Sequence, residues 1–364
     1  QQGGARGVMC SYNEYNGVPA CGDAWLLRDV LRRGGGFDGY VASDSGAVAW
    51  IYEPDAHNYT ATPEEGVALA LRAGTDVDSN LDRGDHATGS PYVWYFNASR
   101  DAGLISEADV DAALNRTLWL RFALGLFDPI DDQPLWRVPP EVVGAPEHAR
   151  LSLDMAREGI VLRKNDASTL PLAPGQTIAV LGPHANATKA LAGNYLGQLC
   201  ADAYGSFDCV PTPHAAIARA NAGGATTLAE GVSVSGDDGS GIDAALALAR
   251  DADAVVLMLG LDTETVEREG LDRVNISLPG RQDELARRAL ALGKPTVAVL
   301  LNGGAVGCDA LAAAAPALVE AFYPSAHGAE ALADVLFGAV APSGRMPYTT
   351  PRAAFVDEVD FLDY

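Results

Sequence analysis

The chain has 364 residues, of which 48% are hydrophobic and 20% charged, a composition typical of folded globular proteins with enough apolar material for two buried cores. Lys and Arg number 25 against 48 Asp and Glu, and the formal charge of −23 would repel a phosphate backbone, which argues against nucleic acid as a partner. No apolar run approaches the ~20 residues that a membrane-spanning helix needs, so we expect no membrane span.

Short apolar runs alternate with helical patterns over residues 7–79. In order they are GVMCSYN, AWLLRDVLR, GYVASDSGAV, EEGVALALRAG and TDVDS. This succession predicts strand, helix, strand, helix and strand, the pattern of a parallel sheet wrapped by helices. Polar side chains follow the strands, and we expect them at one rim, where the carboxyl ends of parallel strands meet. These side chains are Tyr12, Asn13, Asp44, Ser45, Asp76 and Asp78.

A longer helix is predicted next, with Ser106 as its cap, Asp109 at its third position and Gly125 at its end. The following segment, FDPIDDQPLWRVPPEVVGAPEH, contains five prolines and has no sustained period. It predicts a linker between two domains, with the boundary near residue 150.

The strand pattern restarts after the linker. TIAVLG, AVVLMLG, PTVAVLL and ALVEAFY are short apolar runs that predict core strands, and GIDAALALARDA, PGRQDELARRALALG and GAEALADVLFG have helical spacing between them. Pro279 suits the first turn of its helix, and DALAAAAPA predicts a further helix with small side chains. A second α/β domain with an open sheet is therefore expected.

Two acidic positions follow predicted strands. Asp44 ends a strand in the first half, and ETVEREGLDR, with Glu264, Glu267, Glu269 and Asp272, follows AVVLMLG in the second. Cleavage of an acetal bond needs two carboxyl groups, one to attack the anomeric carbon or activate water and one to protonate the leaving oxygen. The chain can supply them from two domains that face each other across a cleft. A retaining mechanism would place them about 5–5.5 Å apart.

Several segments in the right order carry a family resemblance. They are VMCSYNEYNGVPACGDAWLLRDVLR, GYVASDSGAV, RAGTDVDS, EGIVLRKNDASTLPL, VEREGLDRVNISLPGRQ and APSGRMPYT. Together they resemble glycoside hydrolase family 3 over nearly the whole chain. Within that family they are most similar to the β-xylosidase and α-L-arabinofuranosidase branch, whose members carry an MCSYN motif, an EAE motif before DR, and LPG followed by Q.

The resemblance implies roles for individual residues. Asp44, in ASDSGAV, matches the nucleophile that forms the covalent glycosyl-enzyme intermediate, and Glu269, in EGLDR, matches the acid/base. The register of the acid/base loop varies in the family, so Glu267 is a rival. Tyr12 matches a tyrosine of the sugar pocket, and Ser45 takes the place of the branch's usual cysteine as a substrate-binding position. This chemistry needs neither a metal nor a cofactor, and the histidines show no metal-ligand spacing.

The resemblance also implies a domain plan. Residues 1–130 match the C-terminal part of a catalytic (β/α)8 barrel, and residues 131–155 match an interdomain linker and lead-in helix. Residues 156–351 match an α/β sandwich domain that contributes the acid/base loop, and residues 352–364 match the start of a linker to a further C-terminal domain. Family members have a complete eight-stranded barrel, whereas this sequence starts near its sixth strand. An N-terminally truncated chain is therefore expected, and whether it acts alone stays open.

The implied function is that of a retaining exo-acting hydrolase that releases terminal β-D-xylosyl or α-L-arabinofuranosyl residues from xylan-type oligosaccharides. Two alternatives stay open: a β-glucosidase of the same family, and an inactive fragment or carbohydrate-binding remnant. A nucleotide-binding module is disfavoured, because LLNGGAVG places glycines after a strand without the G-x-G-x-x-G spacing. The sequence does not fix the oligomeric state.

Cysteines and sequons predict a secreted glycoprotein. Cys10 with Cys21 and Cys200 with Cys209 are close enough in sequence to close short loops, and Cys308 is left over. Five Asn-x-Ser/Thr sequons suit passage through an oxidising, glycosylating compartment. Their asparagines are Asn58, Asn97, Asn115, Asn186 and Asn275.

Overall fold

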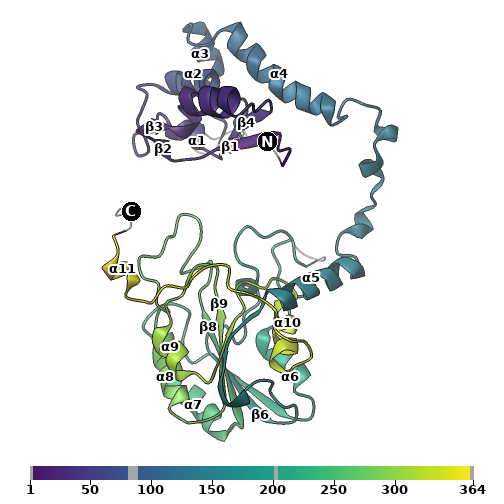
Figure 1. Ribbon diagram of the computed structural model, residues 1–364, viewed down its shortest axis with the longest axis vertical. Coiled ribbons are helices and arrows are strands. Elements are labelled where there is room, and N and C mark those ends of the chain that lie inside the picture. Colours follow the sequence, from purple (N-terminus) through teal and green to yellow (C-terminus); the bar gives the residue numbers. More distant parts are fainter. Residues whose placement is uncertain (1–2, 81–88, 201–203, 361–364) are drawn as a thin grey trace. The chain divides into compact units, whose positions relative to one another are not determined.

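A computed structural model describes residues 3–80, 89–200 and 204–360. The chain divides into two compact units, Gln1–Pro139 and Pro140–Tyr364, and each is described by itself (Figure 1). Both contain parallel strands connected by helices, so the α/β fold class expected from the sequence is confirmed. None of the described helices is both long enough and apolar enough to cross a membrane.

Parallel strands form the centre of the first unit. β1 (Gly7–Cys10) pairs in parallel with β4 (Tyr40–Ser43), and Val77 makes a parallel bridge to Ala42 of β4. Between these segments lie a π-helix (Trp25–Gly34) and α2 (Pro63–Ala73). The order of strand, helix, strand and helix that the apolar runs predict is thus confirmed, whereas the third predicted strand, TDVDS, is reduced to a single β-bridge at Val77. The carboxyl ends of the three extended segments lie on the same side, as parallel pairing requires.

Shorter elements surround these strands. β2 (Glu14–Tyr15) and β3 (Val18–Pro19) form an antiparallel hairpin, followed by a 3-10 turn (Ala20–Gly22), and α1 (Ala47–Trp50) follows β4. The unit continues through α3 (Pro91–Asp101) and α4 (Glu107–Ala123) and ends in short 3-10 turns. These turns are Ile130–Asp132 and Pro134–Arg137, and a third, Pro140–Val142, opens the second unit.

Helix α4 begins and ends as its sequence predicts. The side chain of Ser106 accepts a hydrogen bond from the N–H of Asp109, and the carboxylate of Asp109 accepts one from the N–H of Ser106. This reciprocal capping satisfies two of the N–H groups that have no partner within the helix. After the last helical residue, Gly125 takes a φ of +74°, the left-handed conformation that commonly ends a helix.

One predicted rim residue of the first unit points elsewhere. Asp76 is buried, and its carboxylate forms ion pairs with Arg32 at 2.7 Å and Arg116 at 2.6 Å and accepts a hydrogen bond from the N–H of Val41. Asp78, two positions further on, instead accepts hydrogen bonds from the hydroxyls of Ser43 and Ser90 at the rim. The expectation that Asp76 lines the rim is wrong, because two arginines balance its charge inside the unit.

The second unit is built on a six-stranded sheet in the order β5-β10-β9-β8-β6-β7. All neighbours are parallel except β5, which pairs antiparallel with β10. The strands are β5 (Val161–Asn165), β6 (Thr177–Leu181), β7 (Ala225–Ala229), β8 (Ala254–Gly260), β9 (Thr296–Leu301) and β10 (Ala317–Glu320). The four apolar runs of the sequence correspond to β6, β8, β9 and β10, so their strand prediction is confirmed.

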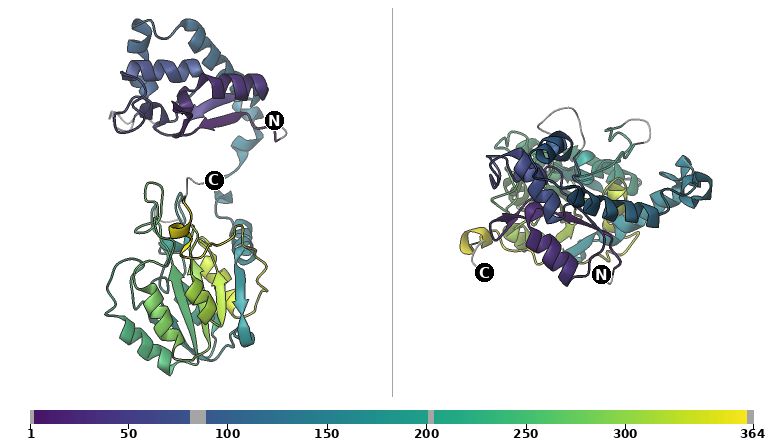
Figure 2. Two further views of the ribbon diagram at one scale, coloured as in Figure 1. Left: turned by 60° about the vertical axis from the view of Figure 1, so that its left-hand side comes forward. Right: turned by 90° about the horizontal axis from the view of Figure 1, so that it is seen from above.

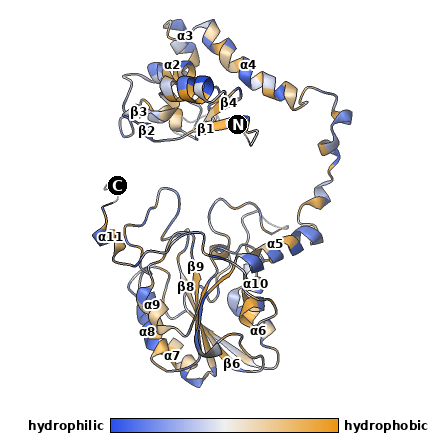
Figure 3. Ribbon diagram, in the orientation of Figure 1, coloured by the Kyte–Doolittle hydropathy of each residue, from blue (hydrophilic) through white to orange (hydrophobic). Residues whose placement is uncertain are grey.

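Helices cover both faces of this sheet (Figures 1 and 2). On one face lie α5 (Pro146–Gly159), α6 (Pro213–Ala220) and α10 (Gly328–Leu336), and on the other α7 (Ile242–Asp251), α8 (Gln282–Leu290) and α9 (Asp309–Ala314). Alternate residues of β8 enter the two cores: Val256 and Met258 face the first set of helices, whereas Leu257 and Leu259 face the second. The central strands are therefore apolar throughout, as Figure 3 shows for β8 and β9.

Smaller elements complete the second unit. They are 3-10 turns at Asp166–Ser168 and Lys189–Leu191 and the short helix α11 (Phe355–Glu358). Helix α8 starts at Gln282, with Arg281 as its cap residue, so the expectation that Pro279 occupies its first turn is wrong. Gln282 is fully buried, and its side-chain amide bonds both the N–H and the C=O of Gly260, which fixes the helix start against the end of β8.

Candidate active site

Asp44 lies directly after β4, at the carboxyl end of the parallel strands of the first unit. Its N–H donates to the carbonyl of Cys10 in β1, and its carbonyl accepts from the N–H of Ala47 as helix α1 begins. Its carboxylate is partly exposed and accepts one hydrogen bond, from the N–H of Ser45 at 2.8 Å. Among the residues that the structure describes, no cation lies within ion-pair distance of this carboxylate. The backbone is thus held firmly while the side chain stays accessible.

Tyr12 lies beside Asp44 at the same strand ends. Its hydroxyl donates to the carbonyl of Ser45 at 2.7 Å, and its ring lies 4.7 Å from that of Trp50, measured between centroids. The backbone carbonyl of Tyr12 contacts Nε2 of His57 at 2.6 Å, and the other ring nitrogen of His57 lies 3.4 Å from the carboxylate of Glu14. The structure therefore brings Tyr12 and Ser45 next to Asp44, as the sequence suggested, and it also brings His57 to this rim.

A third strand end completes this rim. The hydroxyl of Ser43 donates to Asp78 at 3.1 Å and accepts from the N–H of Ser79, and the hydroxyls of Ser45 and Ser79 are 3.3 Å apart. Ser90 donates a further hydrogen bond to Asp78. These contacts join the ends of two neighbouring extended segments, so the orientation of Asp44 follows from the sheet itself.

The second unit presents its acidic segment at a switch point of the sheet. The chain leaves β6 through α6 on one face, whereas it leaves β8 through α8 on the opposite face, and β6 and β8 are neighbours. Connections that diverge in this way leave a crevice at the carboxyl ends of the strands, where open α/β sheets bind ligands. The segment after β8 starts at the buried Asp262, whose carboxylate accepts from the N–H groups of Glu264 and Thr265.

A tight turn carries Glu269. Arg268 and Leu271 pair antiparallel, with the N–H of each donating to the carbonyl of the other at 3.2 and 2.9 Å, and Gly270 has a φ of +74°. Glu269 and Gly270 therefore form a two-residue connection, for which a left-handed residue is usual. The Glu269 side chain is exposed, and its carboxylate accepts a hydrogen bond from the hydroxyl of Tyr195.

Glu267 differs from Glu269 in its surroundings. Its Oε1 accepts hydrogen bonds from the N–H groups of Gly303 and Gly304 and from the hydroxyl of Tyr323, at 2.9, 3.0 and 2.8 Å. Its Oε2 lies 3.2 Å from the N–H of Gly304 and 3.4 Å from Nε of Arg273. Every one of these partners is a donor, so the Glu267 side chain is placed as an acceptor of hydrogen bonds.

The acidic turn lines a pocket of about 390 Å³ in the second unit. Its walls are formed by the turn, by the segment after β6 and by the segment after β10: Asn194, Thr263, Glu267, Arg268, Glu269, Leu271, Asp272, Arg273 and Tyr323. A second pocket, of about 640 Å³, lies beside it and shares Asn194, Thr263 and Arg268 with it. Tyr195, Phe207 and Lys189 line this second pocket, and Lys189 pairs with Glu264.

Comparison with known families accounts for both halves of the chain. The glycosyl hydrolase family 3 N-terminal domain matches residues 2–120, and the glycosyl hydrolase family 3 C-terminal domain matches residues 160–361. The chain belongs to glycosyl hydrolase family 3. The family resemblance noted in the sequence is thereby confirmed, and the exposed Asp44 and Glu269 lie in the N-terminal and C-terminal domain matches respectively.

Curated relatives of this family 3 chain are named as xylosidases. It is 40% identical over 364 residues to a probable exo-1,4-β-xylosidase of Aspergillus fumigatus, covering 98% of this chain and 44% of the relative. It is 38% identical over 360 residues to β-D-xylosidase 3 of Arabidopsis thaliana, covering 97% of this chain and 43% of the relative. The chain thus spans less than half the length of the curated relatives that it matches.

Solved structures give the same family 3 relationship. A GH3 exo-β-xylosidase, XlnD, in complex with a xylobiose aziridine activity-based probe superimposes with a TM-score of 0.86 at 34% identity, over 97% of this chain and 43% of that one. A β-glucosidase from Listeria innocua in complex with isofagomine superimposes with a TM-score of 0.79 at 28% identity, over 93% of this chain and 44% of that one. The barrel-type domain followed by an α/β sandwich domain is therefore the fold of this family 3 chain.

The structure adds residues to the site that sequence reasoning missed. Tyr195 contacts Glu269 from the segment after β6, and Tyr323 and the Gly303–Gly304 backbone contact Glu267 from the segments after β10 and β9. These residues are 36 to 74 positions from the glutamates that they contact. Of these residues, only Gly303 and Gly304 stood out in the sequence, as glycines that follow a predicted strand in LLNGGAVG. That pattern was considered only for a nucleotide-binding module, which the spacing disfavours.

Proposed function

We propose that the protein is a retaining, exo-acting glycoside hydrolase that removes terminal β-D-xylosyl residues from xylan-type oligosaccharides. The observation that carries this proposal is the position of Asp44, a partly exposed carboxylate at the carboxyl end of a barrel-type strand in a family 3 chain. The relatives' names support xylose as the sugar. Terminal α-L-arabinofuranosyl groups are a second candidate substrate, which the sequence resemblance alone implies.

Asp44 acts as the nucleophile in this proposal. A nucleophilic carboxylate must be ionised and must have room for an anomeric carbon, and Asp44 has one backbone hydrogen bond to fix its rotamer and solvent beside it. In this proposal Tyr12 and Ser45 bind the sugar beside Asp44. The Tyr12 hydroxyl donates a hydrogen bond to the Ser45 carbonyl, and the Tyr12 ring packs against Trp50, so both residues are held in place. No metal or cofactor takes part in this chemistry.

Glu269 acts as the acid/base, and the contacts of the two glutamates support this choice over Glu267. A general acid must reach the leaving oxygen, whereas both oxygens of Glu267 face donors of the second unit and its side chain is only 16% exposed. Glu269 is exposed at the tip of its turn and lines the pocket, with the Tyr195 hydroxyl as its hydrogen-bond partner.

The reaction then has two steps. Asp44 attacks the anomeric carbon while Glu269 protonates the leaving oxygen, which gives a glycosyl ester on Asp44 and a free alcohol. Glu269, now ionised, takes a proton from water, and the resulting hydroxide displaces Asp44 and releases the sugar with its original anomeric configuration. The mechanism requires the two carboxyl groups about 5–5.5 Å apart around one anomeric centre.

Substitution of the two carboxylates tests these roles. Asp44→Asn should lower turnover of every glycoside, activated or not, by at least about 10³-fold, because no bond to the enzyme can form. Glu269→Gln should slow xylobiose by about 10²- to 10⁴-fold and dinitrophenyl xyloside far less, and azide should accelerate the activated substrate by replacing water.

Asp55→Asn and Glu264→Gln are matched controls, because both side chains are exposed carboxylates of the same two units and neither has a role in the proposal. Proton NMR of the first-formed product should show β-xylose. First-formed α-xylose, or unchanged turnover in Asp44→Asn, would refute the retaining mechanism.

The choice of sugar has its own test, because solved β-glucosidases also superimpose on the chain. Nitrophenyl β-D-xyloside, α-L-arabinofuranoside and β-D-glucoside should be compared by kcat/KM. The proposal expects the xyloside to be preferred. A larger value for the glucoside would assign the chain to the β-glucosidases of the same family.

We also propose that the protein is secreted as a glycoprotein. Disulfides join Cys10 to Cys21 and Cys200 to Cys209, the pairs that are close in sequence, while Cys308 is free and buried. The asparagines of all five sequons are exposed: Asn58, Asn97, Asn115, Asn186 and Asn275. Both features suit an oxidising compartment with glycosylation. Mass spectrometry of the natural protein should find glycans on these asparagines, and five unmodified asparagines would contradict the proposal.

A further inference from the structure

Glu267 collects donors from three different segments of the second unit. Gly303 and Gly304 follow β9, Tyr323 follows β10, and Arg273 lies beyond the tight turn on the same segment as Glu267. The side chain of Glu267 is only 16% exposed, and that of Arg273 is 12% exposed. Charge-assisted bonds shielded from water in this way are the strong ones. One carboxylate thus joins the turn to the ends of two core strands.

The glycine pair after β9 is shaped for this carboxylate. A Cβ atom on Gly304 would come within 2.6 Å of Oε2 of Glu267, and one on Gly303 within 3.0 Å of Oε1 and 2.8 Å of the Tyr323 ring. Any larger residue would push the carboxylate out of its place. Gly303 and Gly304 belong to the LLNGGAVG segment, on which the disfavoured nucleotide-binding alternative rested. Their backbone N–H groups bind an anion, but that anion is the carboxylate of Glu267 in the same chain.

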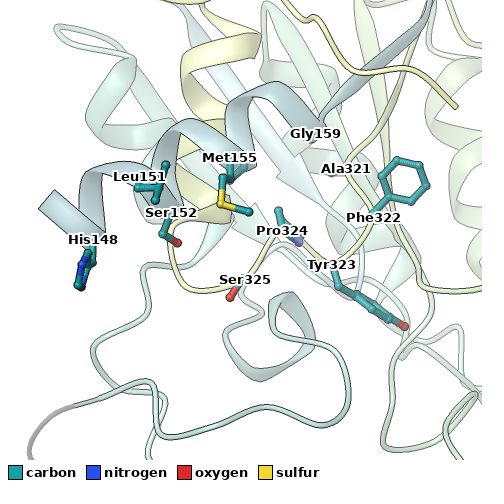
Figure 4. Close-up of a pocket in the computed structure, with 11 residues that line it drawn as sticks. His148, Leu151, Ser152, Met155, Gly159, Ala321, Phe322, Tyr323, Pro324 and Ser325 are labelled. Carbon is teal, nitrogen blue, oxygen red and sulfur yellow. The ribbon is translucent and has the colours of Figure 1, made fainter. Parts of the chain in front are cut away.

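Tyr323 is presented to Glu267 by an unusual stretch of backbone. Phe322 and Ser325 have φ values of +52° and +66°, a region that residues other than glycine rarely adopt, and such strain gathers at functional sites. The N–H of Ser325 donates to the carbonyl of Leu191 at 2.7 Å, which fixes the far end of the stretch. In Figure 4 the Tyr323 side chain extends away from α5 and the Met155 side chain.

Burial and the nearby Glu267 raise the pKa of the Tyr323 hydroxyl well above its usual value. The hydroxyl therefore keeps its proton as a donor to Glu267. A tyrosine held in this state serves as a permanent hydrogen-bond donor rather than as a group that exchanges protons with a substrate.

The contacts of Glu267 with Gly303, Gly304, Tyr323 and Arg273, which we call the Glu267 clamp, lie at the base of the turn that carries Glu269. Going outward along the turn, Glu267 pairs with Arg273, Arg268 pairs with Leu271, and Glu269 with Gly270 forms the tip. In the described part of the chain, the Glu269 side chain has one hydrogen-bond partner outside the turn, the hydroxyl of Tyr195, so its position is set by that hydroxyl together with the two residue pairs below it. Displacement of the Glu267 side chain would break its pairing with Arg273 and would therefore move Glu269.

We propose that Glu267 is a positioning residue: clamped by the Gly303–Gly304 backbone, Tyr323 and Arg273, it holds the turn so that the Glu269 carboxyl group stays at the reacting bond. This inference rests on the proposed function, since it assigns to Glu269 the proton transfer. It gives the second glutamate of the turn a role that is separate from the chemistry. A misplacement of about 1 Å in a catalytic group can cost about 10²-fold in rate.

Two variants break the clamp from opposite sides. Glu267→Gln places an amide N–H₂ among groups that are all donors, and Gly304→Ala puts a methyl group where Oε2 lies. Each should lower kcat for xylobiose by roughly 10- to 100-fold with little change in KM, because the proton donor is displaced while the sugar contacts remain. Tyr323→Phe removes one donor and should give a smaller loss of the same kind.

Glu264→Gln and Gly159→Ala are the matched controls. Glu264 is an exposed glutamate on the same segment, and a Cβ atom on Gly159 would meet nothing within 4 Å. Both controls should keep normal turnover. Hydrogen exchange of the amides in residues 262–273 should be faster in Glu267→Gln than in the parent and unchanged in Glu264→Gln.

A kinetic double-mutant cycle in the full chain decides between positioning and other roles. If Glu267 acts through Glu269, then Glu267→Gln should cause little further loss of xylobiose turnover when Glu269 is already Gln. Fully additive losses would overturn the proposal, because a general structural defect would persist in both backgrounds. The proposal would also be overturned if azide accelerated Glu267→Gln while Glu269→Gln lost little activity. That result would assign the general acid to Glu267. Failure of the proposed function would give a different result, because Asp44→Asn would then leave turnover unchanged. If only the positioning role is wrong, Asp44→Asn still abolishes turnover.

Discussion

His184 should make the second unit lose stability in mild acid. This residue follows β6 and is 1% exposed, and its Nε2 has no hydrogen-bond partner among the described residues. Burial lowers the pKa of His184 to about 4, and the Asp262 carboxylate and the backbone of Leu261 and Gly260 offset only part of that effect. The folded unit therefore keeps the imidazole neutral at pH values at which the unfolded chain binds a proton.

The sign and the size follow from proton linkage. Between pH 6.5 and about 4 the unfolded state binds more protons than the folded state, so the free energy of unfolding falls as the pH falls. A pKa difference of about 2.5 units, at ~1.4 kcal/mol per unit, gives a loss of about 3 kcal/mol when the pH has reached 4. Above about pH 7.5, where the imidazole is neutral in the unfolded chain as well, His184 should contribute no slope.

The tryptophans provide an internal control for this measurement. All five lie within residues 1–139, so their fluorescence reports only the first unit, whereas far-ultraviolet circular dichroism reports both units. Urea titrations at several pH values between 7 and 4 should be followed by both signals. His184→Asn should remove about 3 kcal/mol of pH dependence from the dichroism transition of the second unit and should leave the fluorescence transition unchanged. An unaltered pH slope in His184→Asn would refute the reasoning.

Two further predictions concern the first unit and use tryptophan fluorescence. Asp76→Asn should lower its free energy of unfolding by about 3–5 kcal/mol, because Arg32 and Arg116 would lose their shared buried carboxylate. Ser106→Ala should cost about 1 kcal/mol through loss of the cap of α4, and Ser106→Thr should cost less. A stable Asp76→Asn variant, or a Thr variant as weak as the Ala variant, would contradict the respective assignment.

The elements that the sequence predicted are those whose signals are local. The fully apolar runs of β8 and β9 follow from burial on both faces of the sheet, and the Ser106–Asp109 cap follows from residues three positions apart. β5 and β7 escaped prediction because they are mixed in polarity: β7 is ATTLA, and β5 ends in RKN, where Lys164 reaches the carbonyls of α9. Edge positions allow such residues.

Asp76 and Asp78 show where the sequence prediction of the site failed. Both follow the third extended segment, and nothing local separates them. Asp76 is buried because Arg32 and Arg116, 44 and 40 positions away, converge on it, whereas Asp78 accepts hydrogen bonds from serines of the rim. Alternation along an extended segment places residues two positions apart on the same side, so the sequence pattern treats the two carboxylates alike, and only their partners, distant in sequence, separate them.

The same reasoning separates the two glutamates of the turn. Glu267 and Glu269 have identical side chains two positions apart in the same segment, and composition, spacing and period treat them alike. Their difference lies in what the core strands bring to them: the segments after β9 and β10 bring three donors to Glu267, whereas the segment after β6 brings one tyrosine hydroxyl to Glu269. A carboxylate surrounded by donors anchors a segment, and a carboxyl group with one partner and open space can give up and regain a proton. The division of roles that we propose for this turn therefore rests on the sheet's topology, because parallel strands bring their following segments to one edge.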